Sequence, residues 1–184
     1  VYLRKARINR AVDPAVGGVQ GTFVAEPQTA PITLPMEYVK LIEPLSSQVA
    51  LQPLTEIEMT TVAGGEVFGV AMRPSVSPDG AIRLHAPITL GFDVPDTARR
   101  LAFTVAMDLD ETVPESRRPL AGCELVVYDG DEEIARHTLT PDGPAKRLNL
   151  PLAGEGLRIA LKNGVNGPVL DRVILTDGQL LVSE

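Results

Sequence analysis

Short alternations of apolar and polar residues run through most of the chain, from about residue 55 to residue 182. The clearest run covers 99–107, where leucine, phenylalanine, valine and methionine recur at every second position. A period of two is typical of a β-strand with one buried face. Long stretches with helical periodicity do not occur between these runs, so the pattern predicts an all-β fold.

Glycine, proline, asparagine and aspartate separate the runs, as expected for turns between antiparallel strands. The predicted strands cover 56–59, 66–72, 81–86, 88–94, 99–107, 124–128, 133–138, 146–150, 157–161 and 169–175, with a return over 180–182. The predicted turns are a hairpin at Gly64-Gly65 and the sequences DGDE, PDG, GEG, NGVNG and TDG. About nine or ten strands at this spacing favour a two-sheet antiparallel jelly-roll sandwich over a meander barrel.

Residues 1–53 differ from the rest because prolines and glycines interrupt the segment repeatedly. Such spacing forbids a long helix and supplies few backbone donors to a sheet. We therefore predict an extended N-terminal arm or linker over 1–53, with a short helical turn near 36–42, followed by a β-sandwich over 54–184. Apolar residues such as Phe23 recur in the arm, which indicates that it lies against its own domain or a partner.

Charge is divided unevenly along the chain. The first ten residues contain Arg4, Lys5, Arg7 and Arg10 and no acid, whereas the other 174 contain 13 basic and 24 acidic side chains. The acidic body argues against nucleic acid as a partner, because nucleic-acid binding depends on neutralising phosphates. The basic start suits an anionic surface, either lipid headgroups or an acidic protein face, and a solvated terminus is the alternative.

The sequence contains neither a signal peptide nor the run of about 20 apolar residues that a membrane-spanning helix needs. It begins at Val1 rather than at methionine, and basic residues follow directly. A start methionine, a leader and a whole membrane anchor are the alternatives for what was removed. Because Lys and Arg flank membrane anchors on the cytoplasmic side, one hypothesis is that such an anchor precedes this start. On this hypothesis the cytoplasmic face of a membrane is favoured over secretion.

The order of elements from Glu66 to Leu181 resembles the NPCBM family, galactose-binding-like jelly rolls often appended to glycosidases. The matching segments are VFGVAMRPSVSPDGAIRLHAPITLGFDVPDTARRLAFTVAMDLD, ELVVYDGDEEIARHTLTP and LRIALKNGVNGPVLDRVILTDGQL. Asp171 stands at the family's aspartate, whereas Ile174-Leu175 replaces the family's aromatic residue and Ala106 stands at its glycine. The resemblance implies a jelly roll and carbohydrate binding, but its motifs are structural and carry no ligand-binding residues over to this chain.

Few residues are candidates for catalysis or metal binding. Cys123 is the only cysteine, so it forms no internal disulfide, and we interpret it as a small buried residue. His85 and His137 lie 52 residues apart, and neither has a cysteine or a second histidine beside it. We predict no catalytic residues, no metal ligands and no cofactor, and therefore no enzymatic activity.

Two acidic loops offer the oxygen ligands that calcium prefers. Their members are Asp108, Asp110 and Glu111 in the first, and Asp129, Asp131, Glu132 and Glu133 in the second. The spacing is not that of an EF-hand, so we favour a solvated hairpin surface over a structural calcium site.

Sugar recognition usually needs an exposed aromatic ring. We assign four of the seven aromatic residues, Phe68, Phe92, Phe103 and Tyr128, to the core, and the other three lie in the arm. The segment DLDETVPESRRPLAG is predicted to be a long polar loop. It carries Arg117 and Arg118, which suit either a protein interface or a solvated surface.

These observations predict a non-catalytic accessory or structural subunit that stabilises a larger protein assembly, with a membrane complex as one candidate. The predicted partner-binding residues are Arg4, Lys5, Arg7, Arg10, Phe23, Arg117 and Arg118. The alternative prediction is a carbohydrate-binding module with a glycan as its partner.

Overall fold

The computed structural model describes residues 49–110, 112–154 and 156–183, together with the backbone of strands at 7–8, 18–25 and 28–35. The chain divides into two compact units, residues 1–49 and 50–184, and each is described by itself. Among the described residues, no helix has the length and apolar character needed to cross a membrane.

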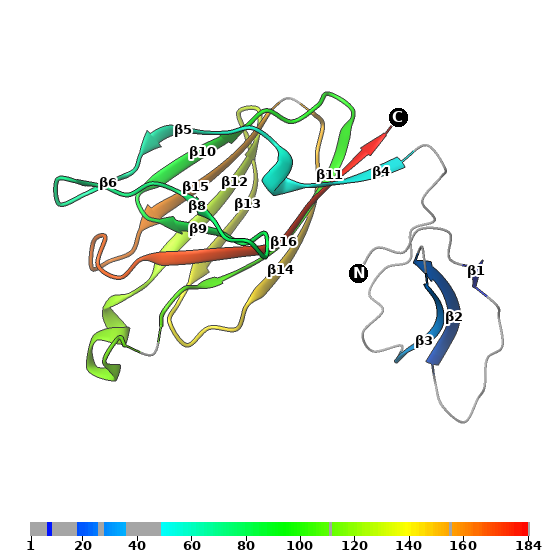
Figure 1. Cartoon of the computed structure of the whole chain (residues 1–184). Coiled ribbons are helices and arrows are strands. Elements are labelled where there is room, and N and C mark those ends of the chain that lie inside the picture. Colours follow the sequence, from blue (N-terminus) through cyan, green and yellow to red (C-terminus); the bar gives the residue numbers. More distant parts are fainter. Residues whose placement is uncertain are drawn as a thin grey trace. The chain divides into compact units, whose positions relative to one another are not determined.

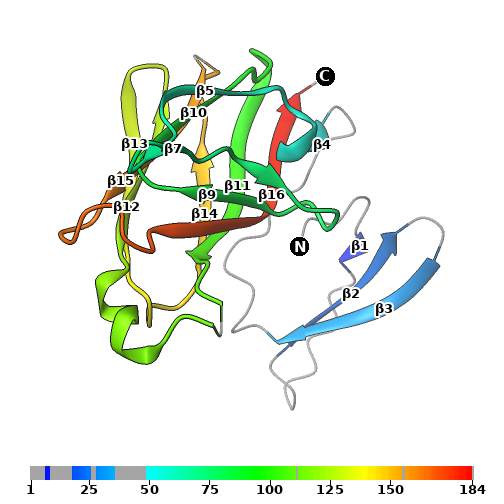
Figure 2. The same cartoon turned by 60° about the vertical axis from the view of Figure 1, so that its left-hand side comes forward.

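The N-terminal unit contains a small antiparallel sheet in the order β1 (Arg7–Ile8), β2 (Gly18–Ala25) and β3 (Gln28–Pro35). Figure 2 shows β2 and β3 as a curved blue ribbon, in which Gly18 pairs with Pro35 and Ala25 with Gln28. The sequence predicted an extended arm or linker over 1–53, and the three strands within it pair with one another. The prolines of β3 are compatible with pairing because β3 is an edge strand of this sheet. The helical turn predicted near 36–42 lies outside the described residues.

The second unit is a sandwich of two antiparallel sheets (Figure 1). The first sheet has five strands in the spatial order β13 (Glu132–Leu139), β12 (Cys123–Asp129), β15 (Leu157–Asn163), β10 (Ile88–Phe92) and β5 (Met59–Gly64). The second has the order β14 (Lys146–Pro151), β11 (Ala98–Met107), β16 (Arg172–Ser183), β9 (Ile82–His85) and β8 (Ser75–Val76), and β4 (Val49–Pro53) also pairs with β16. The predicted jelly-roll sandwich is confirmed, and β4 starts it a few residues before the expected boundary at residue 54.

The core lies between the two sheets and is built from the alternating positions that the sequence pattern indicated. On the five-stranded sheet, Leu125, Ile159 and Leu90 face inward, and the facing sheet contributes Phe103 and other side chains. All four are fully buried. At about 25 cal/mol per Å² of apolar surface removed from water, this burial is the main source of stability.

Two predicted turns prove to be other structures. The TDG sequence lies inside β16, which Figure 1 shows in orange to red crossing the sandwich from end to end. Phe103 of β11 stands opposite both Asp177 and Gly178, because Ala102 pairs with Gln179 and Thr104 with Thr176. The extra residue makes a β-bulge, and Asp177 adopts its positive φ of 52°, which aspartate tolerates better than most residues. The predicted return over 180–182 is therefore wrong.

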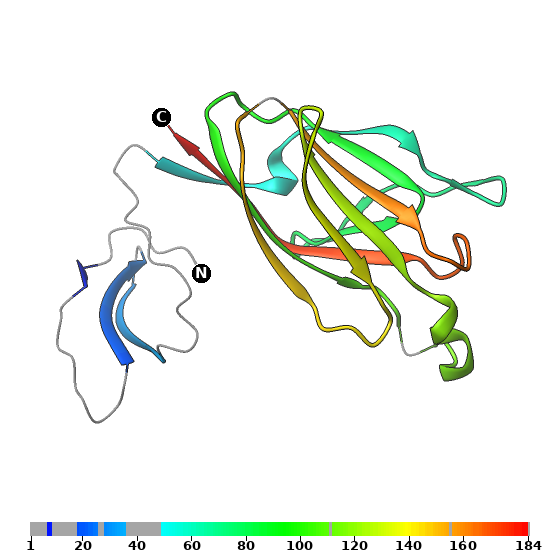
Figure 3. The same cartoon turned by 180° about the vertical axis from the view of Figure 1, so that it is seen from behind.

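The predicted hairpin at Gly64-Gly65 is also wrong. These glycines carry the chain out of the five-stranded sheet, since β5 pairs with β10 and β6 (Glu66–Val67) pairs with β7 (Val70–Ala71). The single strand predicted over 66–72 is instead this second hairpin, whose two-residue turn is Phe68-Gly69. Both turn residues have positive φ, the signature of a type I′ turn. Figure 3 shows this hairpin, in turquoise, projecting from one end of the sandwich.

A buried carboxylate joins the loops at that end of the sandwich. Asp171 is completely buried, and its two carboxylate oxygens accept hydrogen bonds from the backbone N–H groups of Gly122 (2.9 Å) and Gly164 (3.1 Å). Its own carbonyl oxygen accepts the N–H of Ala86 at 3.0 Å. One residue thus connects the segments before β12, after β15 and after β9. Burial raises the pKa of the Asp171 carboxyl, although the two backbone hydrogen bonds act in the opposite direction.

Replacing Gly164 tests how tightly these loops pack. A Cβ atom at Gly164 would lie 1.9 Å from the carbonyl oxygen of Gly122, whereas a Cβ at Gly167 would meet nothing within 4 Å. Gly167 has a φ of +72°, so Gly167→Ala should cost about 1–2 kcal/mol from backbone strain alone. Gly164→Ala should cost about 3 kcal/mol or more in urea unfolding, because backbone must move. Equal costs for the two variants would contradict this packing.

The buried Asp171 carboxyl should leave a signature in the pH dependence of stability. Because its folded pKa lies above the ordinary value of 3.8, the stability linked to its protonation is complete below pH 3.8 and is lost as pH rises through the folded pKa. Asp171→Asn removes this dependence and supplies one acceptor oxygen in place of two, which should cost about 1–3 kcal/mol. Urea unfolding of both proteins from pH 4 to pH 7 should show that the free energy of unfolding of the wild type exceeds that of Asp171→Asn by less as the pH rises. A difference that widens would refute the raised pKa.

Candidate functional site

An open groove of about 710 Å³ lies at one end of the five-stranded sheet. It is found where β5 begins, where β10 ends, and around the turns before β13 and β15. Its lining residues are Glu58, Thr60, Gly91, Phe92, Asp93, Gly130, Asp131, Glu132, Gly156, Leu157 and Arg158. This volume falls within the range of about 300–1,000 Å³ that is usual for small-molecule sites.

The floor of the groove follows one register row across the outer face of the sheet. Tyr128 of β12 pairs with Arg158 of β15, Arg158 pairs with Gly91 of β10, and Gly91 pairs with Thr60 of β5. Because the period of a strand is two, these residues face away from the core that Phe92 and Leu157 enter. The same alternation that fills the core therefore also places a row of polar and small side chains on the outside.

The glycine in the middle of this row leaves room for side chains of the neighbouring strand β5. A Cβ atom at Gly91 would lie 2.9 Å from Cγ2 of Val62 and 3.4 Å from Oγ1 of Thr60. Those two β5 side chains therefore lean over the position where a side chain of Gly91 would stand. Gly130 and Gly156 also line the groove and expose backbone in place of side chains. Glycine-lined walls allow a ligand ring to approach the backbone closely.

Arg158 is held in place at the floor of the groove. Its Nη2 donates hydrogen bonds to the carbonyl oxygen of Gly130 at 2.6 Å and to Oδ1 of Asp131 at 3.0 Å. Its guanidinium carbon lies 5.3 Å from the centre of the Tyr128 ring, within the range of a cation–π contact. The N–H of Gly130 donates to the carbonyl oxygen of Gly156 at 2.6 Å, which connects the two turns at this end. Both of these side-chain hydrogen bonds come from Nη2, and a guanidinium has five N–H donors in all.

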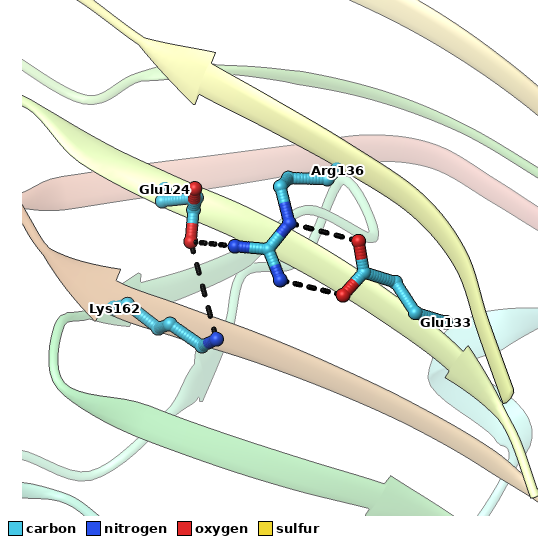
Figure 4. Close-up of polar contacts among 4 residues, drawn as sticks. All are labelled: Glu124, Glu133, Arg136 and Lys162. Atoms are coloured by element: carbon cyan, nitrogen blue, oxygen red, sulfur yellow. Dashed lines mark hydrogen bonds and ion pairs between the residues drawn. The ribbon is translucent and has the colours of Figure 1, made fainter. Parts of the chain in front are cut away.

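The outer face beside the groove carries a network of ion pairs (Figure 4). Arg136 binds Glu133 through Nε (2.8 Å) and Nη2 (2.5 Å), and it binds Glu124 through Nη1 (2.5 Å). Lys162 lies 4.0 Å from the same oxygen of Glu124. The hydrogen bond from Arg136 lowers the pKa of the Glu133 carboxyl. Exposed pairs of this kind contribute little to stability, but they hold the cations of this face against neighbouring acids.

Of the predicted partner-binding residues, Arg117 and Arg118 have described side chains, and neither lines the groove. Arg4, Lys5 and Arg10 lie outside the described residues, and Arg7 and Phe23 belong to β1 and β2, where the backbone alone is described. The other two, Arg117 and Arg118, lie in the 3₁₀ helix η3 (Glu115–Leu120), and Arg118 donates to the carbonyl oxygen of Val113 at 3.4 Å. Their role in partner binding stays a prediction.

The groove residues themselves gave little sequence signal. The DGDE turn was correctly predicted between β12 and β13, and it supplies Gly130, Asp131 and Glu132. The GEG turn likewise supplies Gly156. What could not be predicted is that these turns lie beside Glu58 and Asp93, because that depends on the pairing of β15 with β10 and of β10 with β5.

The assignment of aromatic residues to the core is partly wrong. Phe92 and Phe103 are buried as predicted, whereas Tyr128 is half-buried on the outer face beneath Arg158. Phe68 is 80% exposed at the tip of the β6–β7 hairpin. Its apolar neighbours in sequence suggested a buried strand position, but the turn formed with Gly69 leaves the ring in solvent.

The remaining candidate residues are separate from the groove. His85 belongs to β9 in the six-stranded sheet, where Nδ1 lies 2.6 Å from the carbonyl oxygen of Ala86, while His137 belongs to β13 in the other sheet. In the first acidic loop, Asp108 pairs with Arg83 and Asp110 with Arg172. Over the described ranges, no group of three or more His, Cys, Asp or Glu side chains is arranged to hold a metal ion.

Cys123 is buried, as predicted, with its thiol 4.0 Å from the sulfur of Met107. Burial, reinforced by the neighbouring Asp171 carboxylate, raises the pKa of the thiol to about 12. The thiol is therefore protonated at neutral pH and contributes to packing rather than to chemistry.

Comparison with family models and with curated proteins gives no match to this chain. Solved structures do match. The CBM51 module of a Clostridium perfringens GH95 protein, in complex with methyl-galactose, superposes with a TM-score of 0.52 at 20% identity, covering 71% of this chain and 99% of that one. The CBM51-2 and INT domains of C. perfringens ZmpB superpose with a TM-score of 0.54 at 13% identity, covering 97% of this chain and 41% of theirs. The chain thus spans about two-fifths of the length of that ZmpB fragment.

A third match comprises the tandem CBM51 modules of Sp3GH98, the family 98 glycoside hydrolase from Streptococcus pneumoniae SP3-BS71. Its TM-score is 0.52 at 12% identity, and it covers 74% of this chain and 48% of that one. Identities at this level establish a shared fold. The chain therefore has the jelly-roll β-sandwich fold of these carbohydrate-binding modules, as the sequence resemblance implied.

The buried thiol gives a direct test of the packing around β12. In native buffer at pH 8, Cys123 should react with Ellman's reagent at least about 100-fold more slowly than in 6 M guanidinium chloride, because the thiolate is both scarce and covered. Rapid stoichiometric labelling of the folded protein would contradict the burial of Cys123.

Proposed function

We propose that this domain is a non-catalytic glycan-binding module whose ligand occupies the groove at the end of the five-stranded sheet. The proposal is carried by one observation. The cross-strand neighbours Arg158, Gly91 and Thr60 lie in one row and line a groove that offers hydrogen-bonding groups to a ligand. The shared fold supports the proposal, since the GH95 module with this fold was solved with methyl-galactose bound.

The chemistry of the lining suits hydroxyl groups. A sugar hydroxyl both donates and accepts, so it can donate to a carboxylate such as Asp93 and accept from the guanidinium of Arg158. Thr60 adds a hydroxyl of its own, and Gly156 leaves room for the ring, since a Cβ atom there would meet nothing within 4 Å. The core residues Phe92 and Leu157 expose little surface, so hydrogen bonds rather than ring stacking supply most of the affinity. Binding of this kind is weak, with a dissociation constant on the order of 1 mM.

The predicted role as an accessory subunit finds less support than this alternative. The similar structures are carbohydrate-binding modules, and no contact among the described residues bears on a protein partner or on a membrane. The subunit role and the partner-binding residues therefore stay predictions. The proposed module needs no catalytic group, and the two histidines belong to different sheets.

Isothermal titration calorimetry with methyl-galactose and a panel of neutral methyl glycosides tests the proposal. Wild-type protein should bind at least one of these sugars saturably, near 1 mM. Arg158→Ala should weaken binding about tenfold, because a charge-assisted hydrogen bond contributes about 1.5–3 kcal/mol. Arg158→Lys should recover part of the loss by restoring one charged donor.

Arg147→Ala is the matched control for Arg158→Ala. Its side chain is 41% exposed, compared with 38% for Arg158, but it lies on β14 in the other sheet. This variant should bind like wild type. If folded wild-type protein binds none of the panel, glycan binding is refuted. If Arg147→Ala loses as much affinity as Arg158→Ala, the groove is not the binding site.

A further inference from the structure

The groove has a strong excess of negative charge. Four of its lining residues are carboxylates, Glu58, Asp93, Asp131 and Glu132, and all four are exposed. Against them the lining contains one guanidinium, that of Arg158, which leaves a formal charge of −3.

The one lining cation is already engaged by protein groups. Arg158 binds Asp131 and the carbonyl oxygen of Gly130, and its charge therefore offsets that of Asp131 most directly. Three carboxylates remain, those of Glu58, Asp93 and Glu132, for which no ion pair is recorded within the described chain.

Cations elsewhere on the same face do not compensate for this excess. Arg136 lies between Glu133 and Glu124, and Lys162 also approaches Glu124 (Figure 4). These side chains are paired with acids of their own. The imbalance is therefore localised at the groove.

From this distribution of charge we propose that the groove selects glycans by charge, in the order cationic amino sugar, then neutral sugar, then acidic sugar. The inference rests on the proposed function and adds a ligand class to it: sugars that carry a free, protonated amine. Glu58 and Asp93 are direct cross-strand neighbours, since the N–H of Asp93 donates to the carbonyl oxygen of Glu58 at 3.0 Å. An ammonium group can lie beside these two side chains and donate hydrogen bonds to both carboxylates. A uronic acid in the same position brings a like charge close to these two carboxylates, while the charge of Arg158 is offset by Asp131.

Coulomb's law sets the size of the effect. A unit charge within about 7 Å of the two carboxylates of Glu58 and Asp93 in a solvent-exposed groove interacts strongly enough to change affinity about three- to tenfold per step at low salt, once screening is included. The discrimination should shrink as salt rises, because the Debye length falls from about 30 Å at 0.01 M to about 8 Å at 0.15 M. Discrimination based on shape would not respond to salt in this way.

The test uses three sugars that share one ring and differ in charge: the methyl glycosides of galactosamine, galactose and galacturonic acid. At pH 6 the first is cationic and the third anionic. Calorimetric titration of the full chain in about 20 mM salt should give the order stated, with about three- to tenfold between neighbours. In 0.5 M salt the differences should largely disappear. Ethanolamine, an ammonium without a ring, should bind at least tenfold more weakly than methyl galactosaminide.

Two double variants distinguish the effect of the groove carboxylates from the effect of the net charge of the protein. Glu58→Gln with Asp93→Asn removes two groove charges with little change of shape, and it should cut the ratio of galactosamine to galacturonate affinity at least threefold. Glu115→Gln with Asp142→Asn makes the same change of net charge in η3 and in the turn after β13, and it should leave the ratio unchanged.

The outcomes distinguish a failure of the charge selection from a failure of the proposed glycan binding. Equal affinities for the three sugars, or tightest binding of the galacturonide, would overturn the charge selection while glycan binding stands. An equal effect of the two double variants would also overturn it. Absence of binding by all three sugars would overturn the glycan-binding function and, with it, the selection.

Discussion

The antiparallel register of β12, β15, β10 and β5 is the constraint on which the rest of this structure depends. It places Leu125, Leu161 and Ile88 in one inward-facing row, and it places Tyr128, Arg158, Gly91 and Thr60 in one outward-facing row. A shift of one residue in any pair would exchange the two faces. The core thus fixes the groove, because the hydrophobic burial that sets the register also determines which polar side chains become neighbours on the outside.

At the other end of the same strands, Asp171 has a comparable organising role. Its carboxylate binds the backbone on either side of the β12–β15 pair, at Gly122 and Gly164, while its burial raises its pKa. The two ends of the sandwich therefore differ in kind. One is closed by a buried charge that backbone N–H groups satisfy, and the other is open and lined by exposed charges. This division assigns the first end to stability and leaves the second available for a ligand.

Local pattern was sufficient to predict most strands and the fold. The alternation in β11 and the turns DGDE and PDG have physical causes that act over a few residues, and the structure contains them where they were expected. Prediction failed where a local signal had two structural solutions. Asp177-Gly178 can form a turn or a bulge, and Gly64-Gly65 can form a hairpin or a corner between sheets; the pairing partner decides each case. The groove belongs to the same class, since Glu58 and Asp131 are 73 positions apart in the sequence and line one groove only because the sheet pairs the strands between them.

The central claim is that the open end of the five-stranded sheet binds the ligand, and glycine amides report on it directly. Gly130 and Gly156 line the groove, whereas Gly69 and Gly167 lie in the β6–β7 hairpin and in the loop that follows β15, away from it. In a two-dimensional ¹H–¹⁵N NMR titration with methyl-galactose, the account predicts saturable shifts of Gly91, Gly130 and Gly156 and stationary peaks for Gly69 and Gly167. Shifts confined to Gly69 and Gly167, with the groove glycines unmoved, would contradict it.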